Sequence, residues 1–233
     1  MKDKFELAVI GATFAGIGAA SENKNSVIIE SGTILGREYV SAFSSFAGEV
    51  LLRTQKALSL RDELLKCGIL SNGRVNPSGV TAYMNKYLLE NGINVLFMTE
   101  VLGVEKKGDF FEITIYSCGK QRKIYANKIL SGKIENAKEE SYYGAAIYCG
   151  GSNKTLPKAW RDDIAFESGA YPGEVYAKIK VNENCGLSQT RLLFYDIWAD
   201  RPGEYADWKI AMFADAFEIR RGAGCNFLID FET

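Results

Sequence analysis

Short apolar runs at the start of the chain are separated by a stretch long enough for a helix. Leu7 to Ile10 is apolar and ends at Gly11, which is typical of a strand buried on both faces. Residues 16 to about 23 can form two helical turns, and Val27 to Glu30 is a second apolar run. A strand, a helix and a strand in this order predict two parallel strands with a right-handed crossover.

Two helices and a meander are predicted next. "EVLLRTQKALSLRDELLKCG" places apolar residues at helical spacing, among them Leu58 and Leu65, and ends at Gly68, a residue type typical of a C-cap. "GVTAYMNKYLLENG" carries an apolar stripe that stops at Gly92. A strand is predicted from residue 94 to 99, running on into a second short stretch. "FFEITIYS" and "QRKIYANKILSGK" alternate around Cys118–Gly119, which predicts a hairpin or meander.

The pattern changes after residue 133. The polar segment "ENAKEES" leads into a region rich in Gly, Tyr and Trp. "EVYAKIKV" and "RLLFYDIWAD" alternate and are predicted as strands, "CNFLIDF" is strand-like, and "DWKIAMFADAFEIRRG" fits a strand or a helix. We therefore predict one domain over residues 1–140. A β-rich substrate, cap or interaction region over residues 141–233 stands apart or packs back onto that domain.

Composition narrows the chemistry. Lys and Arg (28) nearly balance Asp and Glu (29), so charge favours neither a nucleic-acid partner nor an anionic membrane. The absence of histidine excludes Ser-His and Cys-His catalytic pairs. Five widely spaced cysteines without a C-x-x-C pair predict reduced thiols rather than disulfides or a zinc site.

The N-terminal segment has the wrong pattern for a signal peptide. Its apolar run is interrupted by glycines and lacks a small-residue cleavage site. No stretch approaches the roughly 20 apolar residues that a membrane span requires. We therefore expect a cytoplasmic protein.

The turn after the first strand has the residue types of a dinucleotide-binding site. Gly11 suits a tight turn, and Gly16 lets the helix approach the sheet. Thr13 stands where glycine lets the backbone approach phosphates, and its hydroxyl is an alternative donor; Phe14–Ala15 complete the start of the helix. Glu30 is placed to accept hydrogen bonds from the hydroxyls of an unphosphorylated ribose. Glycine and alanine also serve simple strand–helix packing, and that alternative stays open.

Longer motifs carry a family resemblance. "VIGATFAGIGAA" resembles the "VIGGTPAGIAAA" fingerprint of FAD-dependent oxidoreductases in the glutathione-reductase-like superfamily. In that family a T-x-V pattern follows the helix and strand, and its valine backbone meets the adenine; the matching residues here are Thr99 and Val101. "RKIYANKILSGK" resembles the segment that ends in A-T-G, which places Ser131 and Gly132 at the cofactor. The resemblance covers about residues 5–133 in the right order.

The resemblance implies an α/β fold. Its first domain is a Rossmann-like FAD/NAD(P)-binding domain with a parallel sheet and a β-meander, followed by a smaller β-rich C-terminal domain. The implied cofactor is FAD, with hydride passing between a small-molecule substrate and the flavin. Ser31 would contact the cofactor, and Arg37 would pair with a phosphate or lie solvated on the surface. The residues identify no catalytic base and no metal site.

Three departures mark the chain as a short and divergent member. The span from the first glycine to the acid is shorter by about four residues, or one helical turn. The A-T-G motif is replaced by Leu130–Gly132, and the late G-D motif of the family has no clear counterpart. The alternative is a degenerate, non-catalytic relative that keeps the fold, has weak or lost flavin binding, and serves as a partner subunit or ligand-binding protein. The expected partners are a small-molecule substrate and either a second copy of the chain or a partner subunit. NAD binding is a third interpretation, against which the T-x-V pattern and the meander argue.

Overall fold

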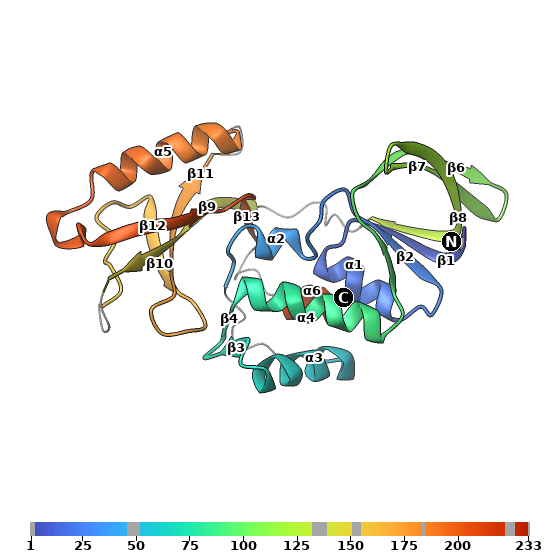
Figure 1. The fold of residues 1–233 in the computed structure, drawn as a ribbon, viewed down its shortest axis with the longest axis horizontal. Coiled ribbons are helices and arrows are strands. Elements are labelled where there is room, and N and C mark those ends of the chain that lie inside the picture. The colour runs from blue at the N-terminus through green and yellow to red at the C-terminus, as the bar shows by residue number, and fades with distance from the viewer. Residues whose placement is uncertain are drawn as a thin grey trace.

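The computed structural model describes residues 3–45, 52–131, 139–150, 155–182, 185–221 and 227–232. Its two larger sheets, of six and five strands, lie on opposite sides of the view in Figure 1, with a group of helices beside the six-stranded sheet. The six-stranded sheet contains parallel strands and the five-stranded sheet is antiparallel. The predicted α/β fold is confirmed.

The six-stranded sheet combines a parallel part with a meander, in the order β5-β2-β1-β8-β7-β6. The pairs β1–β2, β1–β8 and β2–β5 are parallel, and β6, β7 and β8 run antiparallel. Cys118 and Gly119 both have positive φ (51° and 77°), as a two-residue hairpin turn requires. The strands are β1 (Lys4–Ile10), β2 (Ser26–Ile29), β5 (Asn94–Leu96), β6 (Thr99–Lys107), β7 (Phe110–Ser117) and β8 (Lys120–Ser131).

Helices cover one face of the parallel strands and the meander covers the other. Val9 and Ile28 belong to the core under the helices, whereas Ala8 and Val27 belong to the core under the meander. This double burial explains why β1 and β2 read as continuous apolar runs. The helices are α1 (Phe14–Ser21), α2 (Arg37–Val40), α3 (Gln55–Lys66), α4 (Pro77–Glu90) and α6 (Phe227–Glu232), and a small hairpin, β3 (Leu70–Ser71) with β4 (Arg74–Val75), joins α3 to α4.

Two of these helices differ from the sequence prediction. In α3 the buried side chains are Ala57, Leu60 and Leu64, whereas Leu65 is 48% exposed. The segment "CNFLIDF" is predicted as strand-like, but its residues from Phe227 onward lie in α6. This helix packs against α1 where Gly18 has no side chain, since a Cβ there would lie 2.1 Å from the Phe231 carbonyl oxygen.

The five-stranded sheet has the order β10-β11-β9-β12, and β13 also pairs with β9. Its strands are β9 (Glu139–Cys149), β10 (Ile164–Ser168), β11 (Val175–Val181), β12 (Trp208–Phe213) and β13 (Glu218–Arg221). The strand predicted for "RLLFYDIWAD" is wrong: this segment lies in α5 (Leu187–Ala199), because its buried residues recur at helical spacing. A short 3₁₀ turn, η1 (Gly203–Tyr205), follows α5. The domain boundary near residue 140 stays a prediction.

The described part of the chain contains no helix that is long and apolar enough to cross a membrane. The four cysteines within it are free thiols, and Cys225 lies outside it.

Candidate functional site

The turn between β1 and α1 requires glycine at two positions. Gly11 has a φ of 101°, which L side chains rarely adopt, and its N–H donates to the Ile29 carbonyl at 2.8 Å. A Cβ on Gly16 would lie 2.7 Å from the Gly11 carbonyl oxygen and 2.9 Å from Val9 Cγ1. The helix therefore approaches the end of β1 as closely as a dinucleotide-binding turn does.

The N-terminus of α1 is capped by side chains of this chain. The Thr13 hydroxyl accepts the Gly16 N–H at 3.1 Å, so the predicted phosphate donor is the N-cap of the helix. The Phe14 N–H donates to Glu38 Oε1 at 2.8 Å. Ala15 is partly buried in the same turn. The backbone donors of this helix start are those that bind anions in dinucleotide sites.

Glu30 is a buried carboxylate, 8% exposed, directly after β2. Its Oε2 accepts the Ala12 N–H at 2.7 Å and its Oε1 accepts the Gly32 N–H at 2.7 Å. The Thr99 N–H donates to the Glu30 carbonyl at 3.0 Å, which holds the start of β6 beside this position. A carboxylate has about four acceptor positions, and these two N–H groups use two of them. Glu30 is thus fixed in place and can accept two more hydrogen bonds.

A cavity of about 450 Å³ opens at Ser31 and Gly32, the two residues that follow Glu30, at the carboxyl end of the parallel strands. This volume is within the usual range for small-molecule sites, and the position is the usual one for ligands of such sheets. Arg37 is exposed toward it and has no ion pair with any described residue. Ile34 and Met98 are the apolar side chains in the lining of the cavity. The full lining consists of Ser31, Gly32, Thr33, Ile34, Arg37, Ser41, Met98 and Asp215.

Two further predicted residues lie on β6 and β8, outside the lining of this cavity. Val101 is partly buried in β6, next to an irregularity in its pairing with β7. Ser131 ends β8 and pairs with Ile10 at the end of β1. Gly132 lies outside the described residues. The structure therefore gathers the glycine turn, Glu30, Ser31 and Arg37 around one helix start and one cavity.

Glu38 is the residue of this site that the sequence analysis missed. It follows Arg37 in α2, and its carboxylate lies at the start of α1. Burial raises its pKa to about 7; the Phe14 N–H acts against this, while the charges of Asp230 and Glu30 add to it. The sequence marked its neighbour Arg37 as a phosphate partner and gave no signal for Glu38 itself. Two consecutive helix positions point in different directions, so the expectation for Arg37 does not extend to Glu38.

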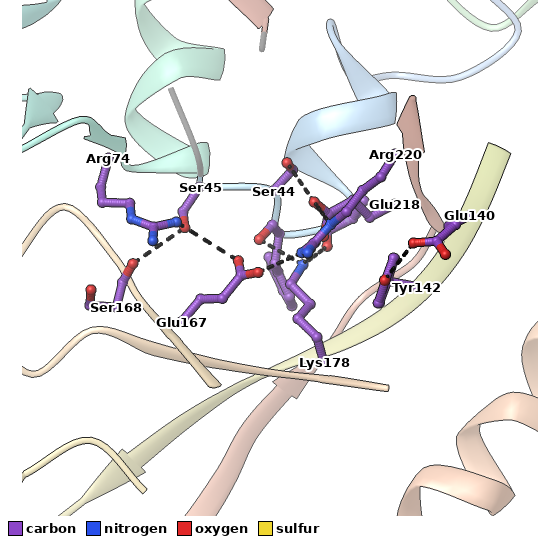
Figure 2. A network of polar contacts seen from close by, with 12 residues as sticks. Ser44, Ser45, Arg74, Glu140, Tyr142, Glu167, Ser168, Lys178, Glu218 and Arg220 are labelled. Atoms are coloured by element: carbon purple, nitrogen blue, oxygen red, sulfur yellow. Dashed lines mark hydrogen bonds and ion pairs between the residues drawn. The ribbon is translucent and has the colours of Figure 1, made fainter. Parts of the chain in front are cut away.

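A second polar cluster joins the loop after α2 to the five-stranded sheet, as Figure 2 shows. Lys178, fully buried in β11, pairs with Glu218 at 2.8 Å and donates to the carbonyls of Ala42 (2.7 Å) and Phe43 (2.9 Å). Burial by itself raises the pKa of Glu218, but Lys178 and Arg220 outweigh it and lower that pKa. All three ammonium hydrogens have acceptors, so Lys178 holds the loop in place rather than offering a nucleophile.

The same cluster continues through Arg220, which pairs with Glu218 at 3.0 Å and with Glu167 at 2.5 Å. Ser44 donates to Glu218 at 3.2 Å. No sequence motif marks these residues, since their partners come from distant segments. Their effect on the candidate site is indirect: they fix the chain that follows α2, which carries Glu38.

No protein-family model and no curated protein matches the sequence. Solved structures with similar folds include p-nitrophenol 4-monooxygenase PnpA from Pseudomonas putida DLL-E4, with a TM-score of 0.55 and 12% identity over 95% of this chain and 68% of that one. A flavoprotein/dehydrogenase from Cytophaga hutchinsonii has a TM-score of 0.53 and 15% identity over 92% and 65% of the two chains. The substrate-free rebeccamycin biosynthetic enzyme REBC has a TM-score of 0.58 and 7% identity over 95% and 55%.

At these identities the likeness is one of fold. The chain spans 55% to 68% of the length of these three proteins.

Proposed function

We propose that this chain binds FAD across the carboxyl ends of β1 and β2 and acts as a flavin-dependent oxidoreductase on a small molecule. The observation that carries the proposal is the buried Glu30 carboxylate, which accepts one N–H from Ala12 in the glycine turn and one from Gly32, a residue that lines the 450 Å³ cavity. A shared fold with a solved flavoprotein/dehydrogenase adds support.

The residues present fit the adenosine end of FAD. Glu30 retains acceptor positions for the two ribose hydroxyls, and the cavity that opens at Gly32 provides space next to the ribose. Arg37, which lines this cavity, offers a cation for a phosphate oxygen. The diphosphate fits the start of α1 once the Phe14 N–H is released from Glu38.

FAD, when bound, supplies the hydride chemistry. The chain's own residues bind and orient the cofactor: Glu30 selects a ribose with free hydroxyls, and the α1 N-terminus holds an anion. Without histidine, proton transfer to a substrate would fall to Tyr, Lys, Asp, Glu, Cys or water.

A second candidate function is favoured by the contact between Glu38 and the Phe14 N–H. A chain that fills its own diphosphate site is expected of a non-catalytic relative that keeps the fold and serves as a partner subunit or binds a ligand without a diphosphate. Such a protein would be colourless and would fail to bind added FAD.

Titration of the purified protein with FAD, followed by flavin fluorescence and the visible spectrum, tests the proposal. We expect saturable binding, and a loss of about 10- to 100-fold in affinity for Glu30→Gln, because one charge-assisted contact to the ribose is lost. Glu22→Gln, which removes a carboxylate at the other end of α1, should bind FAD like the wild type. Equal affinity of Glu30→Gln and wild type would show that the ribose contact is wrongly assigned, and absence of binding at pH 6 and pH 8 would favour the second candidate.

A further inference from the structure

We infer that Glu38 competes with the diphosphate of the dinucleotide for the N-terminus of α1, so that cofactor binding takes up a proton on this side chain. The inference rests on the proposed function, whose site it regulates.

The competition follows from one hydrogen atom. Glu38 Oε1 lies 2.8 Å from the Phe14 nitrogen, the distance at which a phosphate oxygen would also bind. A backbone N–H has a single hydrogen and serves one acceptor well. A diphosphate that uses the α1 N-terminus must therefore displace the Glu38 oxygen or share the donor with it.

The backbone that carries Glu38 is held from two sides. At its start, the Gly36 N–H donates to the Ala12 carbonyl at 2.7 Å. At its end, the Ser41 carbonyl accepts the N–H groups of Asp215 (2.8 Å) and Ala216 (3.2 Å). Because the backbone is anchored in this way, we do not expect α2 to move when a diphosphate binds. Glu38 instead releases the Phe14 N–H through a change of its charge or of its side-chain rotamer.

The surrounding charges oppose a diphosphate while Glu38 is ionised. The charge of Glu30 acts on it from the residue after β2 and that of Asp230 from α6, and Asp230 also accepts the hydroxyl of Tyr39 at 2.6 Å. Within the described ranges Glu38 has no ion-pair partner, and the cation on its own helix, Arg37, is exposed in the cavity.

Protonation of Glu38 removes one of these negative charges and creates an O–H donor for a phosphate oxygen. A pKa of about 7 places this protonation within the range of ordinary buffers. At a pH well above this value, binding of FAD therefore adds close to one proton to the Glu38 carboxylate, taken from solvent.

The test compares the affinity for FAD of wild type, Glu38→Gln and Glu22→Gln at pH 6, 7 and 8. Glutamine keeps an acceptor for the Phe14 N–H, so the helix cap survives while the charge is lost. With a folded pKa of about 7, wild-type affinity should fall by about tenfold between pH 6 and pH 8. Glu38→Gln should bind equally at both and about tenfold tighter than wild type at pH 8, and Glu22→Gln should follow the wild type.

A second measurement does not depend on any variant. Calorimetry of wild type with FAD at pH 8, in two buffers of different ionisation enthalpy, should detect uptake of close to one proton per cofactor bound. FAD binding without proton uptake, or with the same pH dependence in Glu38→Gln, would overturn the inference and leave the proposed function intact. Absence of FAD binding by wild type and by Glu38→Gln at every pH would overturn both.

Discussion

Replacing Glu38 by glutamine should stabilise the cofactor-free protein at pH 8 and leave its stability unchanged near pH 4. The folded state raises the pKa of this carboxyl from its ordinary value of 4.5 to about 7, chiefly through burial. Between these two values the folded chain binds more protons than the unfolded chain. The free energy of unfolding therefore falls as the pH rises from 4.5 to 7, and is flat above.

The size of the effect follows from the same two values. At 1.36 kcal/mol per pKa unit, the difference between 4.5 and about 7 corresponds to about 3 kcal/mol. Because the Glu38 side chain is only partly buried, screening by solvent reduces this difference, and we expect about 1 to 3 kcal/mol at pH 8. The glutamine variant retains the acceptor for the Phe14 N–H, so loss of the helix cap does not offset the gain.

Urea denaturation followed by tryptophan fluorescence at pH 4, 6 and 8 measures this difference. Other titrating groups are common to both proteins and cancel when the two curves are subtracted. Glu22→Gln serves as the control, because it makes the same change of charge at an exposed position at the end of α1. It also removes a surface ion pair with Lys56, and such pairs contribute little to stability. An equal difference between wild type and Glu38→Gln at pH 4 and pH 8, or a less stable variant at pH 8, would refute the argument.

Two structural predictions concern the neighbourhood of this site. Lys178→Met should lower the free energy of unfolding by about 3 kcal/mol or more in urea denaturation, because it leaves a buried carboxylate without one of its cations. Lys180→Met, which removes an exposed ion pair on the same strand, should cost far less, and equal costs would contradict the difference in burial. Gly36→Ala should lower stability by about 2 to 4 kcal/mol, because φ is +60° and the new Cβ would lie 2.3 Å from the Phe14 ring. Gly92 has a φ of +64° but open space around it, so Gly92→Ala should lose only the about 1 to 2 kcal/mol that the positive φ costs an alanine. An equal loss of stability in Gly36→Ala and Gly92→Ala would argue against the close contact at Gly36.

The parallel strands and the meander were predictable because their signals are local. β1 and β2 are buried on both faces and read as apolar runs, and the glycines between them are required by φ and by close approach. The hairpin at Cys118–Gly119 follows from two residues with positive φ between alternating strands. Such features depend on short stretches of chain.

α5 was predicted wrongly because apolar residues lie on both of its sides. Its buried positions are Thr190, Phe194, Ile197 and Trp198, at helical spacing, but Leu192 and Tyr195 are 66% and 53% exposed. These exposed apolar residues hide the helical period and imitate a strand. α6 has six residues, too few to show a period, and is defined by its packing against α1.

Glu38 lay beyond sequence reasoning for a related reason. Arg37 was expected to pair with a phosphate, but it is the next residue, Glu38, whose side chain reaches the start of α1. Which of the two points at α1 depends on the position of α2, and that position is set by Gly36 against Phe14 and by the loop held at Lys178. These contacts are long-range, so no window of sequence contains them.

A crystal structure of the protein grown with FAD tests the central claim most directly. The account predicts that the Glu30 carboxylate lies within hydrogen-bond distance of the ribose hydroxyls, and that a phosphate oxygen takes the Phe14 N–H that Glu38 now holds. FAD bound elsewhere, or no bound FAD with Glu38 still on the Phe14 N–H, would contradict it.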